Sequence, residues 1–292
     1  MILSLLLLLL LAFVVSFHFF GLKPSTNSIE LNLPPSPPRF PITGNLHQLL
    51  GTATLPHRSL QALSKKYGPL MFMHLGYSPT LVVSSAEIAR EIIKNHDIVF
   101  SNRPKTTAAN VFLYGCQDIG FSPYGEYWRQ ARKTCVLGLL STRNVKSLQN
   151  SEISSASSSF GSSRDTSIIR GYDIPARVTV YLNAWAIQRD PKVWKRAEEF
   201  LPERFMNNTV DFKGQDFEFI PFGAGRRGYP GMSFALATVE YLLANLFYYF
   251  DWKLPDGAAD ESLDMTEVHG LTVHKKFPLL IVPALYSPKL MM

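Results

Sequence analysis

The sequence predicts a mainly α-helical fold with small β-sheets, which is an α+β class. It also predicts a membrane-spanning helix at the amino terminus. Residues 1–20 contain no charged side chain, which is typical of a membrane span. Apolar residues recur at helical spacing in Pro56–Tyr67 and in Ala86–Asn95. The runs Leu70–Leu75 and Thr80–Ser84 are strand-like, and the Gly- and Pro-containing tetrapeptide between them is a hairpin signal.

The composition fits a globular or membrane-attached protein. Of the 292 residues, 46% are hydrophobic and 12% aromatic, so disorder is not expected. The net charge of +6 suits an anionic membrane face or an acidic protein partner. The basic residues form no long run, which argues against nucleic acid as a partner. The two cysteines, Cys116 and Cys135, are interpreted as buried thiols in a reducing compartment.

The first 20 residues, MILSLLLLLLLAFVVSFHFF, are long enough to span a bilayer. A helix that rises about 1.5 Å per residue would extend roughly 30 Å over this length. A cleaved signal peptide would show basic residues before the apolar run and a small-residue cleavage site after it, so an uncleaved anchor is favoured. Lys23 and Arg39 follow the span, which places the rest of the chain in the cytosol. A soluble core helix is the alternative.

A proline-rich stretch follows the predicted anchor. Residues 34–41 read PPSPPRFP, and such segments are stiff and extended. A stiff piece after an anchor would fix how the body of the protein sits over the membrane. A generic linker would serve the same mechanical role.

The remaining segments are assigned from composition. We expect a loop over a pocket at 105–122, strands at 171–189, a helix start at 190–194 and closing strands at 271–282. Ser151–Ser163, SEISSASSSFGSS, has little apolar material to bury and is predicted to be a linker or a scar.

Trp128 and Arg132 lie four residues apart on a predicted helix, EYWRQARK, and therefore on one face. An indole N–H and a guanidinium directed to the same point can hold a carboxylate. The alternative is a Trp ring packed on an Arg side chain, without a ligand.

The stretch Pro221–Ala235, PFGAGRRGYPGMSFA, is the strongest candidate site. Its four loop glycines permit backbone shapes that a Cβ would forbid, and Arg226 and Arg227 suit carboxylates. A loop of backbone N–H groups before a helix favours an anion. The loop therefore predicts a cradle for an anionic, flat ligand, with a Gly-rich helix entry as the alternative.

This loop resembles the haem-binding loop of the cytochrome P-450 family, F-x-x-G-x-R-x-C-x-G. The residues that match are Phe222, Gly225, Arg227 and Gly231. The family's Cys, whose thiolate binds the haem iron, is replaced by Tyr229. The resemblance implies haem as cofactor, the matching residues as its contacts, and Tyr229 at the metal position. It also implies that Trp128 and Arg132 grip a haem propionate.

The resemblance to plant microsomal P-450s covers residues 33–148 and 164–286, and it includes the proline hinge and a P-E-R-F box at Pro202–Phe205. The middle of the family fold is missing. Absent are the long helix with an acidic residue and a Thr that handle dioxygen, and the E-x-x-R helix that pairs with the P-E-R-F arginine. The predicted organisation is an anchor (1–20), a linker and hinge (21–45), an N-terminal P-450 part (46–150), a Ser-rich junction (151–163) and a C-terminal haem-loop part (164–292).

By lineage the resemblance implies a membrane-bound haem monooxygenase that inserts one oxygen atom into a small lipophilic compound. Electrons would come from NADPH through a reductase, and the chain would sit in the endoplasmic reticulum as a single-pass protein with its body in the cytosol. Tyr229 and the missing centre predict impaired or absent catalysis, so no catalytic residue is assigned. A phenol has a pKa of about 10 against about 8.5 for a thiol, and its longer side chain would displace the porphyrin.

Two alternatives to an active enzyme follow. The chain is a non-catalytic remnant or a wrongly assembled fragment, or it binds the reductase without chemistry. The second rests on a basic surface of Arg226, Arg227, Lys133 and Arg132. The apolar helix expected at Met232–Phe250 would normally pack on the missing helices, so its exposed face predicts aggregation, chaperone capture or membrane adhesion.

Overall fold

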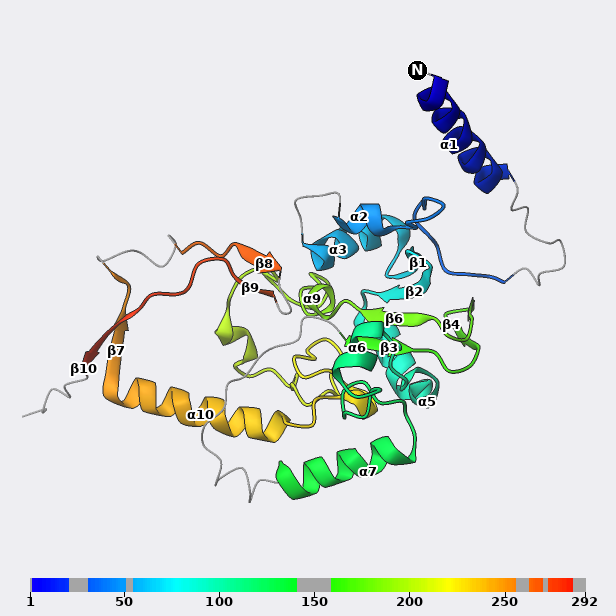
Figure 1. Cartoon of the computed structure of the whole chain (residues 1–292). Helices are drawn as coiled ribbons and strands as arrows, with labels where there is room; N and C mark the ends of the chain where they lie inside the picture. The colour runs from blue at the N-terminus through cyan, green and yellow to red at the C-terminus, as the bar shows by residue number, and fades with distance from the viewer. Residues whose placement is uncertain are drawn as a thin grey trace, which may run out of the picture.

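The computed structural model describes residues 2–20, 31–50, 55–140, 159–255, 263–269 and 273–285 (Figure 1). The helices are α1 (Ile2–Phe20), α2 (Leu46–Leu50), α3 (Pro56–Tyr67), α4 (Ala86–Arg90), α5 (Asp97–Phe100), α6 (Thr107–Phe112), α7 (Glu126–Thr134), α9 (Ala184–Ile187) and α10 (Met232–Tyr249). The strands are β1 (Leu70–Leu75), β2 (Ser78–Val83), β3 (Ser159–Ser162), β4 (Ser167–Ile169), β5 (Tyr172–Ile174), β6 (Thr179–Leu182), β7 (Phe250–Lys253), β8 (Glu267–His269), β9 (Val273–Lys275) and β10 (Val282–Leu285). The structure is therefore mixed, with short helices around small sheets.

A four-stranded sheet in the order β1-β2-β6-β3 forms the centre of the body. β1 and β2 make the expected antiparallel hairpin, in which Leu75 faces Ser78 across a two-residue turn. β6 runs parallel to β2, and β3 antiparallel to β6. The sheet thus joins the segments on both sides of the Ser-rich stretch.

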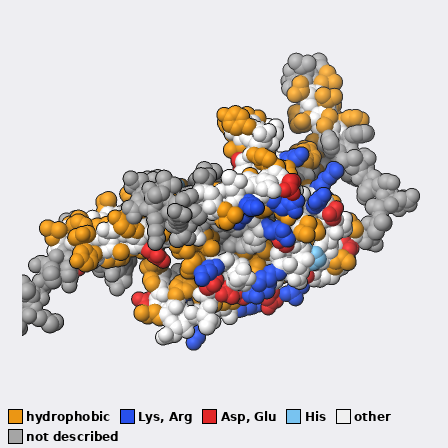
Figure 2. Space-filling view, turned by 90° about the horizontal axis from the view of Figure 1, so that it is seen from below, with side chains coloured by type: hydrophobic (Ala, Val, Ile, Leu, Met, Phe, Trp, Pro, Cys, Tyr) orange, Lys and Arg blue, Asp and Glu red, His pale blue; other side chains and the backbone are white. Residues whose placement is uncertain are grey.

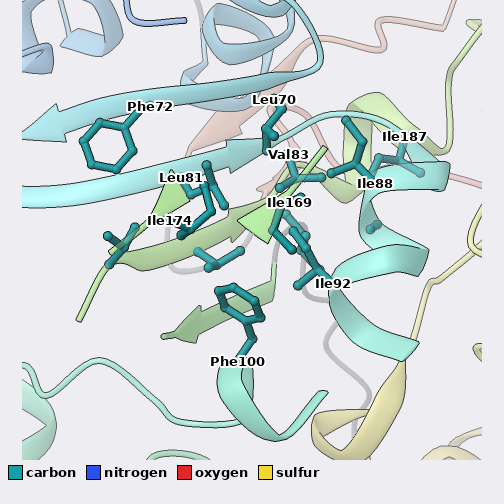
Figure 3. Close-up of a cluster of buried hydrophobic side chains, with 14 of the residues drawn as sticks. Leu70, Phe72, Leu81, Val83, Ile88, Ile92, Phe100, Ile169, Ile174 and Ile187 are labelled. Atoms are coloured by element: carbon teal, nitrogen blue, oxygen red, sulfur yellow. The ribbon is translucent and has the colours of Figure 1, made fainter. Parts of the chain in front are cut away.

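Both faces of this sheet are buried. Alternate residues of β1 point to opposite sides of the sheet, and both sets lie in apolar clusters. Leu70 and Phe72 face a core that α4 closes with Ile88 (Figure 3). Met71 and Met73 face a smaller cluster closed by α2 and α3. A strand buried on both faces shows a continuous apolar run, as LMFM does here.

Local signals account for the two helices that cover the sheet. α3 begins with Pro56 at its first turn, where a missing N–H costs nothing, and ends at Gly68 with a positive φ of 101°. α4 begins after Ser85, whose side chain accepts a hydrogen bond from the Ile88 N–H. It continues as a π-helical turn over Glu91–Asn95, so the predicted helix 86–95 is confirmed.

Four other expectations are corrected. The strand region predicted at 171–189 stops at Leu182, because the Asn183 side chain caps α9. The helix start expected at 190–194 is a series of turns, and the loop at 105–122 contains α6. The end of the predicted Ser-rich junction is β3, because pairing with β6 overrides its composition. Residues 151–158 lie outside the described part of the chain.

The C-terminal elements α10, β7 and β10 have few side chains packed against them, as expected if the middle of the P-450 fold is missing. Only Ala235 of α10 is buried, and β10 is exposed along its whole length although it pairs with β7. Figure 2 shows hydrophobic side chains spread over the side where Figure 1 places α10 and β7. The exposed large side chains of α10 are Val239, Tyr241, Leu242, Leu243, Leu246, Phe247, Tyr248 and Tyr249. The prediction of an uncovered apolar helix is confirmed.

α1 forms over Ile2–Phe20, and its side chains from Leu6 to Val15 are exposed. Among the described residues, none of the helices combines the length and apolarity required for a membrane crossing.

Candidate functional site

Arg227 is the centre of the candidate site. It lies on a single 3₁₀ turn, Gly225–Arg227, in the loop before α10. Its guanidinium donates to the backbone carbonyls of Ser101 at 2.7 Å, Ser122 at 2.6 Å and Ile119 at 3.4 Å. Burial, reinforced by neighbouring guanidiniums, lowers the pKa of Arg227 to about 10. The residue therefore ties the loop to segments more than a hundred positions earlier in the chain.

Trp128 and Arg132 share one face of α7, as predicted, and both meet this loop. Trp128 is 3% exposed and its indole N–H donates to the Ile119 carbonyl at 2.9 Å. The guanidinium of Arg132 donates to the Gly228 carbonyl at 2.8 Å. The Trp128 ring lies 4.3 Å from the guanidinium carbon of Arg227 and 5.4 Å from that of Arg132. The indole N–H is thus engaged with backbone rather than aimed at an open anion site.

A third arginine, Arg103, joins this cluster and was not foreseen. It donates to the Gly120 carbonyl at 3.0 Å, and burial lowers its pKa while Asp118 partly offsets that effect. Within the described residues, none of Arg103, Arg132 and Arg227 makes a salt bridge to a carboxylate. Three half-buried cations with only backbone acceptors would be stabilised by an incoming anion.

Arg226 points away from this cluster. It forms an ion pair with Asp97 and donates to the Tyr124 hydroxyl at 2.8 Å. The hydrogen bond to Asp97 raises its pKa. Because Arg132 and Arg227 are turned inward, the basic surface hypothesised for a reductase partner is reduced to Arg226 and the exposed Lys133.

Tyr229 is 51% exposed and lies beside Phe222. Its ring is stacked on that of Phe222, with centroids 6.1 Å apart and planes 11° apart, and its N–H donates to the Phe222 carbonyl at 2.8 Å. The two rings line an open cavity of about 400 Å³ together with Arg132 and Met232. The predicted site residues thus fall into two adjoining groups, the arginine cluster and the Phe222–Tyr229 stack.

Two glycines of the loop have close neighbours. Gly225 has φ +67°, and a Cβ there would lie 2.4 Å from the Ile93 side chain. A Cβ at Gly231 would lie 2.9 Å from the end of the Tyr229 ring. At Gly225 the glycine is therefore explained by backbone conformation and close packing, before any ligand is considered.

The family model for cytochrome P450 matches residues 34–168 and 162–282, which is most of the chain. This chain belongs to the cytochrome P450 family. The two matched stretches meet at 162–168, next to the Ser-rich segment.

Plant P450s are among the similar proteins. The chain is 33% identical to the phenylacetaldehyde oxime monooxygenase of Prunus mume, over 91% of each chain, and 32% identical to a cytochrome P450 of Persea americana, over 82% of this chain and 91% of the relative. A solved zebra fish cytochrome P450 with progesterone matches with a TM-score of 0.63 at 14% identity, covering 80% of this chain and 100% of the other. The structural match shows the P450 fold.

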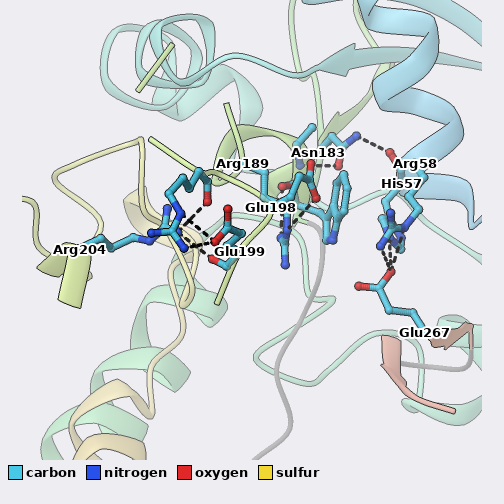
Figure 4. Close-up of polar contacts among 11 residues, drawn as sticks. His57, Arg58, Asn183, Arg189, Glu198, Glu199, Arg204 and Glu267 are labelled. Carbon is cyan, nitrogen blue, oxygen red and sulfur yellow. Dashed lines mark hydrogen bonds and ion pairs between the residues drawn. The ribbon is translucent and has the colours of Figure 1, made fainter. Parts of the chain in front are cut away.

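The P450 alignment also contains many positions that this chain does not fill. It runs over 484 positions with the Prunus mume enzyme, 192 more than the 292 residues of this chain. In agreement with a missing E-x-x-R helix, Arg204 of the P-E-R-F box donates to backbone carbonyls of Leu201, Arg196 and Glu199, at 3.1, 2.9 and 2.7 Å (Figure 4). Local carbonyls thus replace the expected side-chain partners.

The P450 family implies haem as cofactor. The residues of this chain suit the carboxylates of haem but not its iron. Arg132, Arg227 and Arg103 lack anionic partners among the described residues and would suit the carboxylates of the haem edge. The residue that would ligate the iron does not fit, because Tyr229, with a phenol, stands where the family has a Cys thiolate. No reaction step is therefore assigned through this group, and the roles of Phe222, Gly225 and Gly231 in holding haem stay predictions.

Proposed function

We propose that this chain is a P450-family polypeptide that keeps the anion-binding edge of a haem site and has lost monooxygenase activity. The observation that carries the proposal is Tyr229, which stands at the family's Cys position with its ring stacked on Phe222. A phenol is harder to ionise than a thiol, and a phenolate donates less electron density to iron than a thiolate.

The alignment positions that this chain does not fill support the same conclusion. At least 192 alignment positions in total have no counterpart here, and α10 is left with most of its large apolar side chains exposed. Each Leu or Phe that loses a fully buried environment forfeits about 1.5–3 kcal/mol, against a total stability of about 5–15 kcal/mol. The substrate-enclosing part of the fold would be absent as well.

The ancestral reaction is the oxidation of a small lipophilic compound, with haem, a reductase and NADPH. Two relatives, phenylacetaldehyde oxime monooxygenase and costunolide synthase, are named for small organic compounds. Purified full-length chain, reconstituted with a plant reductase, NADPH and such an oxime, is expected to form no oxygenated product. A matched full-length relative is the positive control. Product formation above a reductase-only reaction would refute the proposal.

We propose further that residues 1–20 anchor the chain in the endoplasmic reticulum with its body in the cytosol. Support comes from the uncharged stretch and from Lys23 and Arg39 behind it. The chain should stay in microsomes after carbonate washing, and protease added outside should digest its body. Release by carbonate, or protection of the body, would exclude this topology.

A further inference from the structure

The β8–β9 hairpin touches the body of the protein through a compact polar contact. Glu267 of β8 accepts two hydrogen bonds from Arg58, from Nε at 3.0 Å and from Nη2 at 2.9 Å. The same carboxylate oxygen lies 3.4 Å from Nε2 of His57. Figure 4 shows Glu267 reaching toward both side chains, which leave the first turn of α3.

The α3 side of this contact is fixed by its neighbours. His57 is 3% exposed, and its ring lies 4.9 Å from the ring of Trp185 in α9. The Asn183 amide donates to the His57 carbonyl at 2.9 Å. The guanidiniums of Arg58 and Arg189 also lie 4.8 and 4.5 Å from the Trp185 ring. His57 is therefore packed into the body of the protein by α9 and Asn183, and Glu267 of the hairpin contacts it from β8.

Among the described residues, three charged groups act on His57. Glu267 comes from β8, Arg58 from α3, and Arg189 from the segment after α9, with Glu198 at 4.0 Å from Arg189. Burial is the largest influence and lowers the pKa of His57, while Glu267 raises it and the two arginines lower it further. Burial alone would raise the pKa of Glu267, but Arg58 and His57 together lower it. His57 is therefore neutral, and Glu267 charged, near neutral pH.

We propose that Glu267, Arg58 and His57 form an acid-released latch that holds the β8–β9 hairpin against α3. Lifting the hairpin would bring the buried Nε2 of His57 to solvent, where the pKa returns to its ordinary value near 6.5. The folded pKa lies below that value, so the open form binds the proton more tightly than the closed form. The latch is therefore fully stable above pH 6.5 and weakens as the pH falls from 6.5 toward the lowered value. Protonation of Glu267 would open it further at more acidic pH.

Amide hydrogen exchange of full-length protein tests the latch, with rates corrected for the intrinsic effect of pH. Protection of the hairpin, read from Val268 and its neighbours, should fall between about pH 7.5 and about pH 5.5, by up to about tenfold for each unit of pKa shift. Protection of the β2–β6 pairing, whose strands carry no histidine, should stay constant and reports that the body is folded.

Three variants separate the latch from general acid sensitivity. His57→Gln should remove the change in hairpin protection, and Glu267→Gln should leave the hairpin open at both pH values. His47→Gln is the matched control, because the ring of His47 hydrogen-bonds to the Gly44 carbonyl of its own segment and the variant should keep the wild-type response. If Glu267→Gln fails to fold, Arg58→Lys should lower protection at both pH values with the same response to acid. Equal protection of the wild-type hairpin at both pH values, or an unchanged response in His57→Gln, would overturn the proposal.

Discussion

Replacing Tyr229 by Cys should restore haem binding to this chain. The substitution removes the stacking contact with Phe222, worth about 1 kcal/mol for an aromatic pair. Because Tyr229 is 51% exposed, little other packing is lost. The ordinary pKa of a thiol lies about 1.5 units below that of a phenol, which makes the anion about 2 kcal/mol, or roughly 30-fold, easier to form. Arg132 and Arg227 stand nearby and would favour an anion further.

The assay is a titration of purified chain with ferric haem, followed by absorbance and by the stoichiometry retained after gel filtration. Tyr229→Cys should bind roughly five times more tightly than wild type, since the gain in ionisation of about 2 kcal/mol exceeds the loss of stacking of about 1 kcal/mol. Tyr229→Ser is the matched control: it removes the same ring, supplies no thiolate and should gain nothing. Equal affinities of the Cys and Ser variants would show that the axial donor is not what limits this site.

Three further predictions concern the scaffold. Arg227→Met should lower the free energy of unfolding by about 2–4 kcal/mol in a urea titration, because three partly buried carbonyls lose a charged donor. A loss below about 0.5 kcal/mol would contradict a stabilising role for the arginine cluster. Gly225→Ala should destabilise the protein more than Gly171→Ala in the same titration. Both glycines have a positive φ, but only at Gly225 would the added Cβ meet a neighbour, the Ile93 side chain at 2.4 Å. Equal losses of stability would show that the loop relaxes freely. Leu242→Glu should reduce light scattering of the purified chain while changing its stability by less than about 0.5 kcal/mol, since Leu242 is 52% exposed on α10; unchanged scattering would mean that another surface drives association.

Parts of the fold with local signals were predictable. The β1–β2 hairpin follows from two β-rich runs around a short turn, and α3 from its leading Pro56 and closing Gly68. α9 was missed although Asn183 is a good capping residue, because the surrounding Val, Tyr and Ile favoured a strand. β3 was missed because nothing in its serines indicates a strand; pairing with β6 decides it.

The candidate site divides in the same way. Trp128 and Arg132 were predictable from helical spacing, and Arg227 from the glycine-rich loop. Arg103 was not, since its carbonyl acceptor and the two other arginines come from distant segments without a shared pattern. The contact of Arg58 with Glu267 joins positions 209 residues apart, so no local reading could have found it.

The most direct test of the central claim is the carbon monoxide difference spectrum of the reduced, full-length wild-type protein, with haem counted per chain. We expect substoichiometric haem and no thiolate-type Soret band, because Tyr229 supplies no sulfur ligand. A thiolate-type band at one haem per chain would contradict it.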